Sequence, residues 1–199
     1  MPKGSYGYIN SRRKRSLIQT LVLAGISLAF FTAGYLITKT PRNLFSIIAA
    51  IGAIPVGLSV VNLILILKAR PLSAQAHDEI EAHKGRLLIR YELEMTSYER
   101  TWHIGAATVL EKNVILYTEE AEADTAACEK HIREQLAPSG YGDYTIKVYP
   151  PKEFRAFLSR LDQLENLRRV KGVDPAAIED SWQVGTTQTP AGILLSISL

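Results

Sequence analysis

Two long stretches near the N-terminus dominate the pattern of hydrophobic and polar positions along this chain. Residues 16–38 and residues 43–67 contain no Asp, Glu, Lys, Arg or His. As helices they would be about 34 Å and 37 Å long. The hydrocarbon core of a bilayer is about 30 Å thick, so each stretch can cross it with modest tilt. The pattern predicts two transmembrane helices joined as a hairpin over residues 16–68.

A pair of buried core helices and a cleaved signal peptide are the two alternatives. Two successive apolar runs of this length are rare in soluble domains. The basic residues before the first run suit a signal peptide. However, the run exceeds the usual length of about 7–15 residues, and no clear small-residue cleavage site follows it. We therefore expect the first helix to be retained as a membrane span.

The distribution of positive charge predicts the direction of the hairpin. Residues 1–15 form a basic tail with five Lys or Arg and no acidic residue, and residues 68–86 carry four more. The connection between the two stretches carries only Lys39 and Arg42. Positively charged segments stay on the cytoplasmic side, so we expect a multi-pass membrane protein with both termini in the cytoplasm. Pro41 favours a turn between the helices because proline cannot continue a helix.

Small residues recur at four-residue spacing in both stretches, which places them on one face of each helix. We expect helix packing there, either within the hairpin or between subunits of a homo-oligomer, because small side chains let backbones approach closely. An alternative is that Gly and Ala are simply common in such helices. Asn62 is expected to bond a neighbouring helix. The predicted helix-packing residues are Gly25, Ala29, Ala33, Ala49, Ala53 and Gly57.

The basic cluster Arg12, Arg13, Lys14 and Arg15 lies directly before the first span. Juxtamembrane clusters of this kind attract anionic lipids. We therefore expect these four side chains to contact anionic headgroups of the lipid bilayer.

The rest of the chain reads as a juxtamembrane stalk over residues 69–85 and a soluble domain over residues 86–199. Within the stalk, residues 73–84 read as a polar helix or stalk with Ile80 as their one large apolar residue, so they are expected to bury little. In residues 87–95 apolar side chains alternate with charged ones, which predicts a half-buried strand whose charged face includes Arg90, Glu92 and Glu94.

Further elements of the domain follow from period and turn signals. Residues 102–110 and 114–118 are expected to complete a three-stranded antiparallel meander after a turn at 96–100. Asp124 can cap a helix that runs to Leu136, with Cys128 and Ile132 on its inner face. Amphipathic residues after Pro150-Pro151 predict a long helix packed on the sheet.

The remaining segments have weaker signals. A fourth strand is expected at residues 144–148, a short helix at 175–182, a loop at 185–190 and a final apolar strand at 193–199. The prediction is a cytoplasmic α+β domain with a mostly antiparallel sheet.

Charge and cysteine usage narrow the partners of this domain. Residues 71–199 carry all 20 acidic residues and 14 of the 23 basic ones, so their net charge is −6. An acidic domain is a poor match for a nucleic-acid backbone. The single cysteine, Cys128, excludes an internal disulfide and suits a reducing compartment. We expect it to be a buried apolar residue.

The candidate chemistry is sparse. His77 and His83 flank a run of acidic residues, but they are six positions apart and lack the H-E-x-x-H spacing of a helical zinc site. His103 and His131 have no local partner pattern, and the Gly140-Tyr141-Gly142 turn lacks the continuation of a phosphate loop. We therefore predict no catalytic, metal or cofactor-binding residues, and the sequence favours a non-enzymatic role.

The order of elements over about 75 residues, a helix, three strands, a helix and a strand, resembles in topology the core of restriction-endonuclease-like nucleases. That resemblance implies carboxylates and a lysine in a D…E-x-K pattern that holds Mg²⁺. Residues 71–199 contain no E-x-K sequence. This departure and the acidic charge argue against nuclease activity.

Together these features predict an integral membrane protein whose cytoplasmic domain is a protein-interaction or regulatory module. The binding surface is expected on the charged strand face or in an apolar groove near Trp182. Two alternatives remain open. One is a membrane-tethered hydrolase or nuclease-like enzyme with a site assembled from distant residues. The other is a small subunit of a transporter or channel complex.

Overall fold

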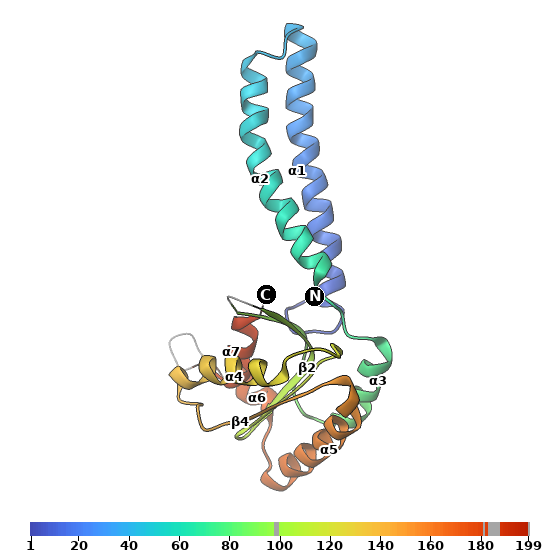
Figure 1. Cartoon of the computed structure of the whole chain (residues 1–199), viewed down its shortest axis with the longest axis vertical. Coiled ribbons are helices and arrows are strands. Elements are labelled where there is room, and N and C mark those ends of the chain that lie inside the picture. The colour runs from blue at the N-terminus through green and yellow to red at the C-terminus, as the bar shows by residue number, and fades with distance from the viewer. Residues whose placement is uncertain (98–99, 181, 183–187, 199) are drawn as a thin grey trace. The chain divides into compact units, whose positions relative to one another are not determined.

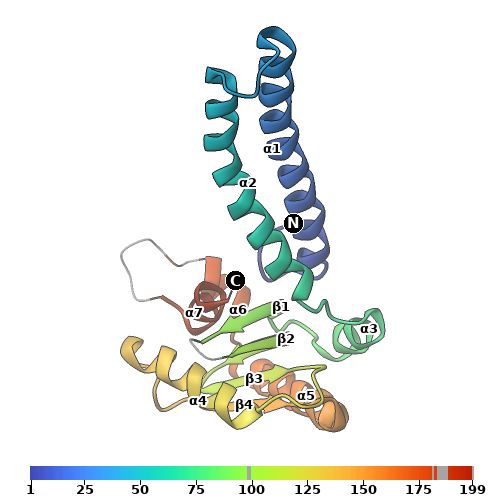
Figure 2. The ribbon, with the colours of Figure 1, turned by 45° about the horizontal axis from the view of Figure 1, so that its top comes forward.

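The computed structural model describes residues 1–97, 100–180, 182 and 188–198 of the chain. It divides the chain into two compact units. Residues 9–70 form one unit, which we call the hairpin, and residues 1–8 together with 71–199 form the other, which we call the domain. Figure 1 and Figure 2 together label the helices and strands of both units.

The hairpin consists of two long apolar helices, α1 (Tyr8–Thr38) and α2 (Leu44–Lys68), as the sequence predicts. Both helices are long and apolar enough to cross a membrane. Helix α1 begins before the uncharged stretch, so the basic residues 12–15 lie in its early turns instead of in an irregular tail. Helix α2 begins after Asn43, whose side-chain oxygen accepts a hydrogen bond from Ser46 N at 2.9 Å.

The domain combines a sheet with helices before, between and after its strands. Short 3₁₀ turns lie at Ala137–Ser139 and Pro151–Glu153. The elements in chain order are α3 (Ala74–His83), β1 (Ile89–Thr96), β2 (Thr101–Leu110), β3 (Asn113–Tyr117), α4 (Thr125–Leu136), β4 (Thr145–Tyr149), α5 (Phe154–Lys171), α6 (Pro175–Asp180) and α7 (Pro190–Ile197).

The four strands form one mixed sheet in the order β1-β2-β3-β4. Strands β1, β2 and β3 make the predicted antiparallel meander, whereas β4 pairs with β3 in parallel. The prediction of a mostly antiparallel sheet therefore needs correction. A parallel neighbour requires a crossover connection, and α4 supplies it between β3 and β4.

Helices cover both faces of the sheet (Figure 2). Helices α3 and α5 pack on one face, where Phe157 and Leu161 of α5 are fully buried. On the other face α4 and α7 pack, and Ile132 and Leu136 of α4 are fully buried there, as the predicted inner face of that helix requires. The sheet is thus the middle layer of the domain.

The alternation of β1 changes face at Glu92. Ile89 and Tyr91 pack with α3 and α5, whereas Leu93 packs with α4 and α7. Glu92 has a φ of 53°, which reverses the pleat at this residue. Glu92 and Glu94 are 2% and 7% exposed, so the predicted charged, wetted strand face is wrong at both positions.

Two further predictions differ from the structure. The segment expected as a polar helix or stalk does form a helix, α3, but the expectation that it buries little is wrong, because its Ala76 and Ile80 are buried in the core of the domain. Residues 193–199 were expected as a strand. Up to Ile197 they belong to helix α7, and Ser198 makes a single antiparallel bridge to Met95. Parts of the expected turn at 96–100 and loop at 185–190 lie outside the described residues.

Candidate functional site

The facing sides of α1 and α2 carry polar groups that bond to one another. The hydroxyl oxygens of Thr20 and Ser59 lie 2.7 Å apart, and Ser27 Oγ donates to the carbonyl oxygen of Ala49 at 2.9 Å. Asn62 Nδ2 lies 3.5 Å from Ser16 Oγ. Interhelical bonds of this kind hold helices together in lipid. The contact of Asn62 with the neighbouring helix is the one that the sequence predicts.

Arg13 closes the open end of the hairpin. Its Nε donates to the carbonyl oxygen of Ile66 at 3.2 Å, and its Nη2 donates to those of Leu67, at 3.2 Å, and Ala69. The last carbonyl groups of a helix have no partner within the helix. One guanidinium group therefore caps the C-terminus of α2 from the side of α1.

This contact separates Arg13 from the other members of the predicted headgroup cluster. Lys14 and Arg15 are exposed, and Arg12 and Arg13 are half-buried. Contact with lipid headgroups stays a prediction for the cluster as a whole. For Arg13 the structure adds a second role within the hairpin.

The six predicted helix-packing residues do not converge within the hairpin. Ala49 is buried against α1, but a side chain at Gly25 or Gly57 would meet nothing within 4 Å. The close approach of the helices is at Gly34, where an added Cβ would lie 2.5 Å from Phe45 Cβ. Packing between subunits through the other positions stays a prediction.

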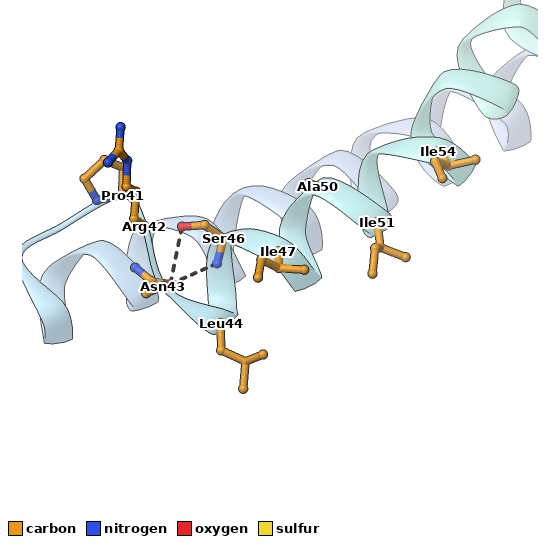
Figure 3. A pocket seen from close by; sticks show the side chains of 9 residues that line it. All are labelled: Pro41, Arg42, Asn43, Leu44, Ser46, Ile47, Ala50, Ile51 and Ile54. Atoms are coloured by element: carbon orange, nitrogen blue, oxygen red, sulfur yellow. Dashed lines mark hydrogen bonds between the residues drawn. The ribbon is translucent and has the colours of Figure 1, made fainter.

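A shallow groove lies beside the turn that joins α1 to α2 (Figure 3). Its lining combines polar residues near Asn43 with the apolar side chains of Ile47, Ile51 and Ile54. The amide of Asn43 is fully engaged, because its nitrogen donates to Thr38 Oγ1 and to the carbonyl oxygen of Thr40. The groove is therefore an apolar surface of α2 that begins next to its Asn43 cap.

The first eight residues of the chain fold onto the domain. The carbonyl oxygen of Gly4 accepts a hydrogen bond from Tyr91 N at 2.8 Å, at the outer edge of β1. The Tyr6 ring stacks on His77 of α3, with ring centres 3.8 Å apart. Lys3 Nζ donates to the carbonyl oxygen of Ser198, so both ends of the chain lie along the same edge of the sheet.

Charged and phenolic groups lie next to the stacked rings of Tyr6 and His77. Tyr91 Oη donates to Glu81 Oε1 at 2.6 Å, and Lys84 Nζ lies 2.7 Å from Glu81 Oε2. Burial alone would raise the pKa of Glu81, but the hydrogen bonds from Lys84 and Tyr91 lower it below its ordinary value. Burial, and then the bond to Glu81, raises the pKa of Tyr91. The cluster therefore holds an ionised carboxylate and a neutral phenol.

A second polar pair, a buried carboxylate and a half-buried histidine, lies on the sheet. His103 Nδ1 is 2.6 Å from Glu94 Oε2, and the two residues are direct cross-strand neighbours in β1 and β2. The carboxylate orients the imidazole ring, an arrangement that also occurs in catalytic and metal sites. This pair was not predicted from the sequence. The expected turn between the first two strands was the usable signal. An antiparallel register that pairs Thr96 with Thr101 places Glu94 opposite His103.

The other histidines and the cysteine are separated in the fold. His77 stacks on Tyr6, whereas His83 Nδ1 lies 3.0 Å from Asp162 of α5. His131 stacks on Trp102 in the core around α4. Cys128 is fully buried, and burial raises the pKa of its thiol to about 12. Within the described residues no group of three His, Cys, Asp or Glu side chains could hold a metal ion.

Beyond the hairpin, the exposed large apolar side chains lie close together in the sequence. From residue 71 onward they are Val170, Ile178 and Trp182 among the described residues. Val170 is 85% exposed at the end of α5, and Ile178 is 50% exposed on α6. These residues span positions 170–182, which include the region near Trp182 where the sequence predicts a binding surface.

Comparison of the chain with protein-family models, with curated proteins and with solved structures gives no match.

Proposed function

We propose that this protein is an integral membrane protein whose two helices, α1 and α2, cross the bilayer and anchor the domain. The observation that carries the proposal is the outward direction of their apolar side chains. Leu21, Ile54 and Leu58 are 63%, 66% and 68% exposed. In the apolar 18-residue stretch of each helix, only 11% of the residues are buried. Soluble proteins rarely expose a continuous apolar surface of this extent. The same exposure argues against a pair of core helices.

The two ends of the hairpin support a cytoplasmic location for both termini. Residues 1–8 lead into α1, whose first residue is Tyr8, and residues 71–199 follow α2, yet the two segments form one compact unit. A chain that crosses the bilayer twice returns to its starting side, so this common unit agrees with two spans. The excess of Lys and Arg around both ends assigns that side to the cytoplasm.

The domain is proposed as a protein-interaction or regulatory module. Its support is the exposed apolar segment of Val170, Ile178 and Trp182. Tryptophan and other large apolar side chains contribute disproportionately to protein interfaces. The polar bonds between α1 and α2 favour an anchor over a pore-lining role, because Thr20, Ser27 and Ser59 bond within the hairpin.

Reporter fusions test the topology. A fluorescent protein that folds only in the cytoplasm is fused after Leu199, and a phosphatase that is active only outside is inserted at Arg42. We expect fluorescence from the first fusion and activity from the second. Activity of a phosphatase placed after Leu199 would refute the assigned side.

Photo-crosslinking tests the interaction surface. A photoreactive residue replaces Ile178 in the full chain, and a matched control replaces the exposed Arg155 of α5. We expect a discrete adduct from position 178 and none from position 155. Equal labelling at both positions would contradict an interface at this segment.

A further inference from the structure

The N-terminal residues 1–8 form a segment with defined internal structure, which we call the strap. Ser5 Oγ donates to the carbonyl oxygen of Pro2 at 2.6 Å, and Tyr8 N donates to that of Ser5 at 3.2 Å. Gly4 has a φ of 82°, and a Cβ there would lie 2.7 Å from Leu195 Cδ2 of α7. The strap is therefore fitted to the domain at a position that only glycine occupies without strain.

The strap reaches two separate elements of the domain. Gly4 bonds to Tyr91 at the edge of β1, and Tyr6 stacks on His77 of α3. Tyr91 and His77 also meet each other, with ring centres 5.1 Å apart. Tyr6 thus completes a group of three rings that joins a helix to the sheet.

The covalent link between the strap and α1 is short. Gly7 alone separates Tyr6 from Tyr8, the first residue of α1. The link from α2 to the domain is longer, because residues 69–73 separate Lys68 from the start of α3. A tilt or axial shift of α1 must therefore be absorbed at Gly7 or transmitted to Tyr6.

We propose that the strap is a mechanical coupling through which movement of α1 opens or closes the contact of residues 1–8 with β1 and α3. In the closed form the Tyr91 amide is bonded to Gly4, and the Tyr6 ring covers His77. In the open form both groups are released at the surface of the domain. A short segment held by a few local contacts belongs to the least stable parts of a fold, which makes it suited to such a change. This inference rests on the proposed membrane location of α1.

Hydrogen exchange at the Tyr91 amide measures the coupling. The full chain is placed in nanodiscs of short-chain and of long-chain phosphatidylcholine, because mismatch with bilayer thickness changes helix tilt. We expect the exchange rate at Tyr91 to differ roughly tenfold between the two bilayers. A short glycine insertion between Gly7 and Tyr8 should remove the difference.

Two variants check that the signal comes from the strap. Tyr6→Ala should accelerate exchange at Tyr91 in both bilayers. Tyr144→Ala, which removes a ring contact with Tyr141 elsewhere in the domain, should leave exchange at Tyr91 unchanged.

The contrary outcomes are distinct. Equal exchange in thin and thick bilayers would overturn the coupling, and so would a Tyr91 amide that exchanges at the unprotected rate throughout. A chain that enters neither nanodisc would refute the membrane proposal itself and the coupling with it.

Discussion

At the residue scale, Glu165 shows how one buried carboxylate ties the domain together. Its oxygens accept bonds from Arg168 Nε at 2.7 Å and from Arg169 Nε at 3.0 Å. A further bond comes from Arg86 N at 3.2 Å, in the connection between α3 and β1. The hydrogen bond from Arg168 is the largest cause that lowers the pKa of Glu165 from 4.5 to about 2.

Glu165 should therefore make stability depend on acidity. A carboxylate whose pKa is lowered on folding stabilises the folded state above its unfolded pKa, and this contribution is lost as the pH falls from 4.5 to about 2. Glu165→Gln should lower the free energy of unfolding by about 1–3 kcal/mol at neutral pH and flatten the dependence across that window. Thermal unfolding across pH measures both effects. Glu134→Gln, in an exposed pair with Lys130, is the control and should change neither.

Arg13 is the residue whose role the sequence could not distinguish from that of its neighbours. Because Arg13 bonds to two carbonyl groups in the last turn of α2 and to that of Ala69 after it, Arg13→Gln should destabilise the hairpin by about 1–3 kcal/mol. Arg13→Lys should restore little, since lysine lacks the planar fork of donors. Unfolding by denaturing detergent measures the change. Arg15→Gln, at an exposed position, should behave like the natural chain, and an equal loss there would contradict the cap.

Cys128 should be inert in the folded protein. Burial raises the pKa of its thiol to about 12, and the thiolate is the reactive form. A thiol reagent should label the native chain slowly and the unfolded chain at the ordinary rate. Fast labelling of the folded protein at neutral pH would show that the Cys128 face of α4 is not packed in the core of the domain.

At the element scale, the two helices of the hairpin are joined by a specific hydroxyl pair. A double-mutant cycle with Thr20→Val and Ser59→Ala should give a coupling free energy of about 0.6 kcal/mol, as for other hydrogen bonds between membrane helices. Detergent-induced unfolding of the four proteins provides the measurement. Thr32→Val is the matched control, because Thr32 bonds to carbonyl groups of its own helix. A coupling of zero between positions 20 and 59 would contradict the observed contact.

Most elements could be predicted from the sequence because their periods are strong. The long apolar helices, the meander and α4 with its Asp124 cap all follow from period and capping signals. The last helix, α7, was mistaken for a strand because a short apolar run fits either structure. Its start carried a usable signal, since Thr189 caps the helix by accepting from Gly192 N at 3.0 Å and Pro190 occupies its first turn.

Features that depend on tertiary contacts were beyond sequence reasoning. The strap has no periodicity of its own, and its place is determined by contacts with His77 and Tyr91. The change of face at Glu92 results from one backbone angle, so the alternating pattern gave the wrong environment for Glu92 and Glu94.

The parallel pairing of β4, by contrast, could have been inferred from the helix between β3 and β4.

At the scale of the whole molecule, the chain divides into an apolar hairpin and a domain to which both ends of the hairpin are covalently connected. In the proposed membrane location, we expect the net charge of −6 for residues 71–199 to disfavour contact with anionic headgroups and the basic residues 12–15 to favour it. This division suits a module that presents a binding surface at a membrane.

Sedimentation of the expressed chain with membranes tests the central claim most directly. If α1 and α2 lie in the bilayer, the protein stays in the membrane pellet after a high-salt and an alkaline wash, and only detergent releases it. Recovery of the folded chain in the supernatant without detergent would contradict the account, because the exposed apolar surface of the helices would then have to be covered in some other way.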